Sequence, residues 1–351
     1  MEQQIQSERV AYYDNAKFIV VIIIFLGHWT GLPTGLNFPI SGINFFYLFN
    51  IPLLAMFSGI FAKQLLMSGQ QTKYYIDNVQ RIFVPFVIFH VIYICFILYY
   101  VNGQVDGFWT LNLMTPATIT WYLLSFLFWR ILLIHFQIMK PFVAIVVAII
   151  CSVGIGYVYG AGEFLSLNRT FVYFPFFLIG SYLDKDFYQR LQERSLKIVS
   201  FVVLICLLMV SVYFNEQIKW DWLSGHLHYR NQFGELFLYG GVFHLIVFIV
   251  QLIACFCVIT LLPTQISWYS RYGKDSMNIY LLQGLFLLFI SKQFARIDSR
   301  FMGILEKHDL MQVVLIFVVT ILVSMIIVSK PMTFLAKYLV RPPLFAIFKK
   351  K

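Results

Sequence analysis

Residues 18–36 read FIVVIIIFLGHWTGLPTGL, and this stretch decides the class of fold. The run is mostly apolar and long enough to cross the ~30 Å hydrocarbon core of a bilayer as a helix. His28 lies well inside it, and Lys17 directly precedes it. On one α-helix, eleven steps of ~100° return these two side chains to within roughly 20° of one face, about 16 Å apart along the axis. An ionisable group inside a membrane is costly, so we take His28 as a candidate functional residue.

The composition of the whole chain agrees with this reading. The 351 residues are 60% hydrophobic and 12% charged, whereas soluble domains carry about 25% charged residues. We therefore predict an all-α integral membrane protein with one domain over residues 1–351. The five cysteines fall within apolar runs, and we expect neither a metal site nor disulfides. The predicted membrane helices lie near residues 18–36, 43–62, 82–101, 119–138, 141–159, 170–184, 196–214, 236–262, 277–295 and 310–329.

The positive charges predict the orientation of this ten-helix protein. If the N-terminus is cytoplasmic, 19 of the 26 Lys and Arg residues fall on the cytoplasmic side and seven on or near the outer side. The positive-inside rule favours this arrangement, which places both termini in the cytoplasm. The net charge of +10 is concentrated in loops on one side of the membrane. The positive-inside rule accounts for it, so nucleic acid is not an expected partner.

The longest predicted outer loop, residues 215–235, is rich in aromatic residues. Trp220, Trp222 and Tyr229 stand there among charged residues and two histidines, His226 and His228. Trp and Tyr at this level usually anchor a protein in the membrane interface, and aromatic rings beside polar groups also suit stacking on sugars. The two histidines, two positions apart, would point to different faces of a helix, so no metal site is expected.

The segment that leads into the first membrane helix carries the clearest candidate chemistry. Asp14 precedes Lys17 by three residues, a spacing that lets the carboxylate hold the ammonium in place. Lys17 can meet a phosphate as a point charge, and a neutral His28 can take a proton from a hydroxyl. The structural alternatives are a snorkelling lysine and a histidine that forms hydrogen bonds between helices.

Residues 12–31, YYDNAKFIVVIIIFLGHWTG, resemble the opening of the membrane-bound acyltransferase-3 family, especially its fucose 4-O-acetylase-like branch. That family has a basic residue, ten intervening positions and a histidine in its first membrane helix. Lys17 and His28 match this pattern, with Lys where many members have Arg.

Five further segments match the family in order, so the resemblance spans roughly residues 9–285. Each segment also fits a plainer role, such as shaping a helix, close packing, interfacial anchoring or the positive-inside rule. Arg169 is the most telling, because it lies on the side depleted of positive charge. The matching residues are Phe57-Ser58-Gly59, Arg81 with Pro85, Trp121-Tyr122-Leu123 with Trp129-Arg130, Arg169 with Pro175 and Gly180, and Gly273, Ser276, Asn278 and Tyr280.

Two positions depart from the family pattern. Many members have a histidine where this chain has Gln283, so a second catalytic histidine is not expected there. The basic pair common before the third helix is reduced to Arg81, because Asn78 stands three residues earlier.

The resemblance implies acyl transfer from acyl-CoA, usually acetyl-CoA, to a sugar hydroxyl of a surface glycan or its lipid-linked precursor. Acyl-CoA would be a co-substrate, no further cofactor is expected, and the protein would be multi-pass in the plasma or inner membrane. His28 would be the general base, and Lys17, Arg81 and Arg130 would hold the donor. The tetrahedral intermediate needs hydrogen-bond donors, which the sequence leaves open among Trp121, Arg169, Ser276 and Asn278.

Two rival interpretations stay open. Ten helices with an intramembrane His and Arg also suit a glycan or lipid transporter or flippase, although no convincing internal repeat is visible. A non-catalytic family member is the other rival, because of Gln283. The acceptor, the acyl chain and the formation of homo-oligomers are not fixed by the sequence.

Overall fold

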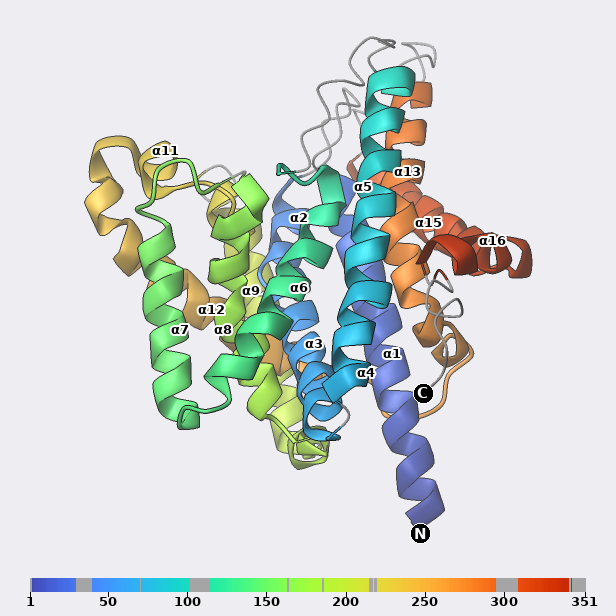
Figure 1. Cartoon of the computed structure of the whole chain (residues 1–351), viewed down its shortest axis with the longest axis horizontal. Helices are drawn as coiled ribbons and strands as arrows, with labels where there is room; N and C mark the ends of the chain where they lie inside the picture. Colours follow the sequence, from blue (N-terminus) through green and yellow to red (C-terminus); the bar gives the residue numbers. More distant parts are fainter. Residues whose placement is uncertain are drawn as a thin grey trace.

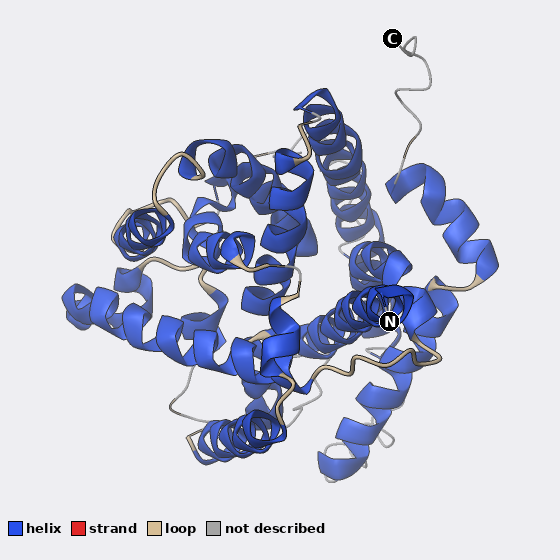
Figure 2. Ribbon diagram, turned by 90° about the horizontal axis from the view of Figure 1, so that it is seen from below, coloured by secondary structure: helices blue, strands red, loops and turns tan. Residues whose placement is uncertain are grey.

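The computed structural model describes residues 2–29, 40–69, 71–101, 114–162, 164–184, 186–214, 217, 220–294, 309–340 and 342. Within these ranges the chain is built from helices and their connecting turns, with no β-strand (Figure 2). In Figure 1, α7, α8, α9 and α12 form one side of the bundle, and α1, α5, α13 and α15 form the other.

Every one of the ten predicted membrane segments coincides with helix in the described residues. The α-helices are α1 (Glu2–His28), α2 (Ile40–Tyr47), α3 (Asn50–Met67), α4 (Gln71–Asn78), α5 (Val84–Phe96), α6 (Trp121–Phe136), α7 (Pro141–Ile155), α8 (Leu167–Tyr182), α9 (Arg194–Tyr213), α10 (Trp220–Ser224), α11 (Tyr229–Phe233), α12 (Gly240–Leu261), α13 (Ser276–Phe294), α15 (Asp309–Ile327) and α16 (Lys330–Val340).

The lengths and hydropathies of these helices identify a multi-pass membrane protein. Six helices in the described residues are long and apolar enough to cross a membrane, and a seventh span results if α15 and α16, bent by 72°, count as one. Both α9 and α12 expose large apolar side chains such as Phe201 (58%) and Ile246 (55%), which suit contact with lipid rather than water. The number of ten spans and the cytoplasmic position of both termini stay predictions.

The first helix differs from its predicted bounds. α1 begins at Glu2, far ahead of the apolar run, and ends at His28. His28 is therefore the last residue of the helix rather than a residue near the middle of a longer one. Gly31 and Pro33 follow shortly in the sequence, and both residue types disfavour the continuation of a helix. The rest of the predicted span, residues 30–36, lies outside the described residues.

Two glycines bring α3 and α8 into the closest contact of the bundle. A Cβ atom at Gly59 would collide with the backbone of Phe177, and one at Gly180 would collide with the backbone of Met56. Small residues let helix backbones approach in a membrane, where dispersion contacts drive association. The close-packing role proposed for these glycines is therefore what the structure shows.

The segment predicted as the first cytoplasmic loop is mostly helical. α3 continues to Met67, and α4 leads through a wide π-helical turn, η2 (Val79–Phe83), directly into α5. The π turn has a local cause: Pro85 has no N–H to donate to the carbonyl of Arg81, four residues earlier. This widened turn carries Arg81.

Candidate active site

Arg169 and Trp121 meet where α8 and α6 begin. The Arg169 guanidinium carbon lies 4.6 Å from the centre of the Trp121 ring, a cation–π contact. The Ser125 hydroxyl lies 2.7 Å from that of Thr170, and the Trp129 indole N–H donates to the Thr170 carbonyl at 2.7 Å. These bonds tie α6 to α8 and so bring Trp121 to Arg169.

Strained backbone precedes both of these residues. Thr118, just before Trp121, has φ 45°, and Leu165 and Ser166, just before the first turn of α8, have φ 50° and 51°. A non-glycine residue rarely adopts this left-handed conformation, least of all a β-branched one. Such strain concentrates at functional sites, where the surrounding structure enforces it. Here it fixes the positions from which Trp121 and Arg169 extend.

His28 lies within electrostatic reach of Arg169. The imidazole Nδ1 of His28 and the Nε of Arg169 are both buried without a hydrogen-bond partner in the structure. Burying such groups unpaired costs free energy, so their neighbourhood is arranged for something other than stability. The end of α1 and the start of α8 thus place an imidazole and a guanidinium within electrostatic reach of each other.

Tyrosines form the wall around Arg169. Tyr47, Tyr173 and Tyr280 all interact electrostatically with it. The hydroxyls of these tyrosines donate to the backbone carbonyls of Gly27 at 2.8 Å, Leu223 at 2.9 Å and Ile119 at 2.7 Å, respectively. Because each hydroxyl is engaged with backbone, we assign these rings to the shape of the site rather than to its chemistry.

His226 also belongs to this neighbourhood, which the sequence did not indicate. It lies in the turn between α10 and α11, and one of its ring nitrogens is 2.5 Å from the Ser224 hydroxyl. Burial, together with the charge of Arg169, lowers the pKa of His226 to about 4. Its neighbour His228 faces the Tyr159 ring instead, at 5.1 Å. Both histidines lie between α10 and α11 rather than in a helix, so the expectation of two helix faces does not apply to them.

A cavity of about 500 Å³ lies toward the opposite end of α6. The predicted donor-binding residues Arg81 and Arg130 both line it, as do Lys73 and Asp77. Trp121 and Arg130 are nine residues apart on α6, so about 14 Å of helix rise separates the levels of the two sites. Phe61, Phe126, Ile82 and other apolar residues complete the cavity wall.

Lys17 lies beside this cavity. Its ammonium is 3.3 Å from the Asp14 carboxylate, so the predicted pair of residues 14 and 17 is present. The same ammonium lies 4.8 Å from the centre of the Phe61 ring, and Phe61 lines the cavity. Lys17 thus contacts the wall of the cavity that Arg81 and Arg130 line, and its role in holding the donor stays a prediction.

Ser276 and Asn278 lie at the start of α13, the helix whose Met277 lines the basic cavity. They stand on either side of Met277 in the sequence. Among the described residues, neither shows a contact with His28 or Arg169. Of the four candidate donors to an oxyanion, Arg169 and Trp121 contact each other, and Arg169 is the one that interacts electrostatically with His28 in the described residues.

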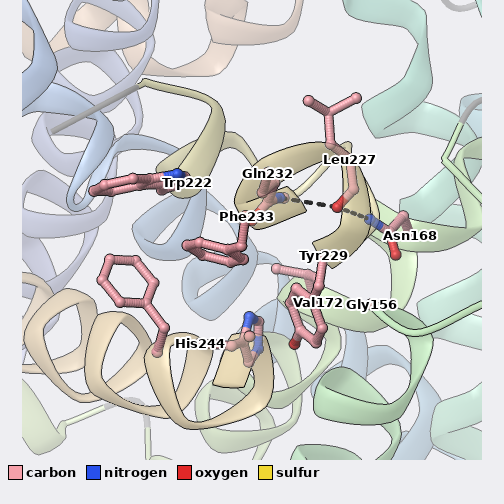
Figure 3. A pocket seen from close by; sticks show the side chains of 12 residues that line it. Gly156, Asn168, Val172, Trp222, Leu227, Tyr229, Gln232, Phe233 and His244 are labelled. Atoms are coloured by element: carbon pink, nitrogen blue, oxygen red, sulfur yellow. Dashed lines mark hydrogen bonds between the residues drawn. The ribbon is translucent and has the colours of Figure 1, made fainter. Parts of the chain in front are cut away.

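A second, smaller pocket opens beside α11 and α12 (Figure 3). The Trp222 and Phe233 rings stack there at 5.7 Å, and Asn168 and Gln232 both donate to the Leu227 carbonyl at 2.9 Å. Tyr229 is only 3% exposed, so the interpretation of this residue as an interfacial anchor is wrong. It packs where a Cβ at Gly156 or Gly240 would collide with its ring.

Comparison with known families decides the class of protein. The model of the acyltransferase domain family known as acyltransferase-3 matches residues 10–329. The chain belongs to the acyltransferase-3 family. No curated protein and no solved structure matches it significantly. The match covers His28, Arg169 and every residue that lines the basic cavity except Val340, while the fucose 4-O-acetylase-like branch stays a prediction.

Both departures from the acyltransferase-3 pattern can be located in the fold. Gln283 is fully buried on α13, one turn beyond Tyr280, and neither end of its amide has a partner. Asn78 is buried on α4, and its side-chain oxygen is also unpartnered.

Proposed function

We propose that this acyltransferase moves an acetyl or other short acyl group from cytoplasmic acyl-CoA to a sugar hydroxyl of a surface polysaccharide or lipid-linked glycan. The observation that carries the proposal is the buried pair of His28 and Arg169, whose imidazole Nδ1 and guanidinium Nε have no partners. Transfer of an acyl group to a hydroxyl is assisted by a base that takes the hydroxyl proton and by a fixed positive charge that stabilises the oxyanion.

The reaction can be written on these residues. His28 takes the proton of the acceptor hydroxyl while its oxygen attacks the thioester carbonyl. The carbonyl oxygen becomes an oxyanion, which the Arg169 guanidinium stabilises from its place over Trp121. When the intermediate collapses, the C–S bond breaks, the ester remains on the sugar, and the imidazolium returns its proton to the CoA thiolate.

The arrangement of the two sites supports an acyl-CoA donor. The arginines of the cavity suit phosphates, and the cavity lies about 14 Å along α6 from the level of Trp121. A pantetheine arm can bridge that distance.

The test is the acyl content of surface glycans in a deletion strain that expresses His28→Ala. Loss of a general base typically costs 10²–10⁴ in rate, so we expect the ester signal in mass and NMR spectra to disappear at normal membrane levels of protein. His135→Ala is the matched control, because His135 is exposed on α6. Undiminished acylation with His28→Ala would remove His28 from the mechanism.

Release of free CoA separates the enzyme from the rival transporter. The purified protein should release CoA from acetyl-CoA only when an acceptor glycan is present. Glycan movement without consumption of the thioester would favour a transporter or flippase.

A further inference from the structure

Asp77 joins the two arginines of the basic cavity. One of its carboxylate oxygens accepts a hydrogen bond from Nε of Arg81 at 2.8 Å, and the other accepts one from Nη1 of Arg130 at 2.9 Å. Arg81 follows Asp77 by four residues, whereas Arg130 comes from α6. A single carboxylate thus sets the distance between two guanidinium groups from different elements.

The local helix explains why Asp77 faces the cavity. Lys73, Asp77 and Arg81 are spaced four residues apart, so they follow one face of the helix that α4 and η2 form. All three line the cavity. Lys73, Arg81 and Arg130 are cationic and Asp77 is anionic. The charged residues that line the cavity therefore sum to a net positive charge.

Arg130 is held firmly and is incompletely satisfied. Its side chain is 3% exposed, and its guanidinium carbon lies 4.4 Å from the centre of the Tyr74 ring and 5.7 Å from that of Phe126. The Tyr74 hydroxyl also donates to the Arg130 carbonyl at 2.8 Å. Nevertheless, Nε and Nη2 of Arg130 are buried without partners. Unpaired charged donors are costly in a protein interior, so the charge of Arg130 is kept at the cavity wall at the expense of stability.

The geometry points to Asp77 as the positioning residue of a phosphate site. It engages one N–H of each arginine and so orients both guanidiniums, while the other donors of Arg81, whose side chain is 63% exposed, stay open to a bound diphosphate. Because this inference rests on the proposed function, the diphosphate is that of acyl-CoA. The same chemistry could serve a phospholipid headgroup, and the experiment includes an arm for that source.

The first measurement is the binding of CoA to the purified full-length protein in nanodiscs of zwitterionic lipid. A hydrogen bond to a charged group is worth about 1.5–3 kcal/mol, roughly ten- to hundredfold in affinity. We expect Asp77→Asn to weaken CoA binding at least tenfold, because the arginines lose their common anchor. Asp184→Asn is the matched control, since its pair with Arg190 is exposed (76% and 75%) and should not matter. Equal affinity of Asp77→Asn and wild type would overturn the inference.

The second measurement asks whether the effect passes through the phosphates. S-acetylpantetheine carries the thioester but no diphosphate, so turnover with this donor should be the same for wild type and Asp77→Asn. With acetyl-CoA, the variant should show a raised KM and an unchanged kcat. A loss of rate with both donors would mean that Asp77 is merely structural. If Asp77→Asn does not fold, Asp77→Glu replaces it, and its longer arm should weaken CoA binding severalfold.

Two outcomes keep this inference separate from the proposed function. If wild type neither binds CoA nor turns over S-acetylpantetheine, the proposed function fails. If anionic lipid in the nanodisc competes with CoA for wild type but not for Asp77→Asn, the cavity is a headgroup site, and the assignment to the donor is overturned.

Discussion

At the scale of single residues, Arg169 is the most constrained side chain of the candidate active site. It is tied to the ring of Trp121 and surrounded by tyrosines whose hydroxyls bind backbone. Among the described residues, no carboxylate forms an ion pair with Arg169. A guanidinium buried in a membrane protein is expensive, and a negative charge that develops beside it during the reaction would offset that cost.

Replacement of Arg169 by Lys tests this assignment. The variant keeps the charge but loses the planar fork that stacks on Trp121. We expect kcat to fall about 10²–10³-fold, the usual cost of one oxyanion donor, with little change in the KM for acyl-CoA. Arg230→Lys is the control, because Arg230 makes a similar cation–π contact, with Phe237, on the surface. A change in KM alone would place Arg169 in substrate binding instead.

The lowered pKa of His226 predicts that the free energy of unfolding depends on pH. The pKa of His226 is about 4 in the folded protein and about 6.5 in an unfolded chain. Between these values the unfolded state binds more protons, so acidification from pH 6.5 toward 4 should lower the free energy of unfolding. His226→Gln should lose less thermal stability over this range than wild type. Identical melting curves at each pH would show that His226 contributes nothing to this loss.

Some of the site could be predicted from residue types and spacing. The pair of Asp14 and Lys17 follows from helix geometry, and Arg81 and Arg130 from the family pattern. The spacing of Asp77 and Arg81, four residues apart, is itself a sequence signal for their ion pair on one helix face. No spacing in the sequence signals the proximity of His226 and Trp121 to Arg169, because these residues lie far apart along the chain.

At the scale of helices, the crossing of α3 and α8 depends on Gly59 and Gly180. Each glycine faces the backbone of the other helix, so a methyl group has no side chain to displace. The two helices can accommodate it only by moving apart, and α8 carries Arg169 in its first turn. The packing of this pair therefore also determines the geometry of the site.

Alanine substitutions distinguish the effect of close helix packing on stability from the effect of helix propensity. We expect Gly59→Ala and Gly180→Ala to lower the melting temperature and the acyl-transfer rate, because overpacking costs about 1–3 kcal/mol. Gly154→Ala on α7 is the control, since a Cβ there meets nothing within 4 Å and alanine is the better helix former. Unchanged melting for both crossing variants would contradict the close contact of α3 with α8.

Hydropathy predicted where helices lie better than where they begin. Apolar runs mark only the part of a helix that contacts lipid or protein core, so the polar first turns of α1 and the whole of α4 escaped prediction. Both segments are rich in Gln, Glu, Lys or Tyr, which form helices at an interface but do not register as membrane spans.

At the scale of the whole molecule, transfer from cytoplasmic acyl-CoA to an outer glycan needs a fixed orientation. The basic cavity must open to the cytoplasm, and the His28–Arg169 cluster must lie toward the outside. Single cysteines in a cysteine-free background test this orientation. A membrane-impermeant maleimide added outside intact cells should label Tyr159→Cys, at an exposed turn after α7, and should label Ser68→Cys, after α3, only once the cells are permeabilised. The reverse pattern would invert the topology and place the donor cavity outside.

The most direct test of the central claim is acyl transfer across the membrane of sealed inverted vesicles. Labelled acetyl-CoA is added to the exposed cytoplasmic face, and the host's own glycans are enclosed in the lumen. The account predicts labelled esters on the enclosed glycans, with one CoA released outside per ester formed, and no ester in vesicles that carry His28→Ala. Equal labelling with His28→Ala, or esters formed without release of CoA, would contradict it.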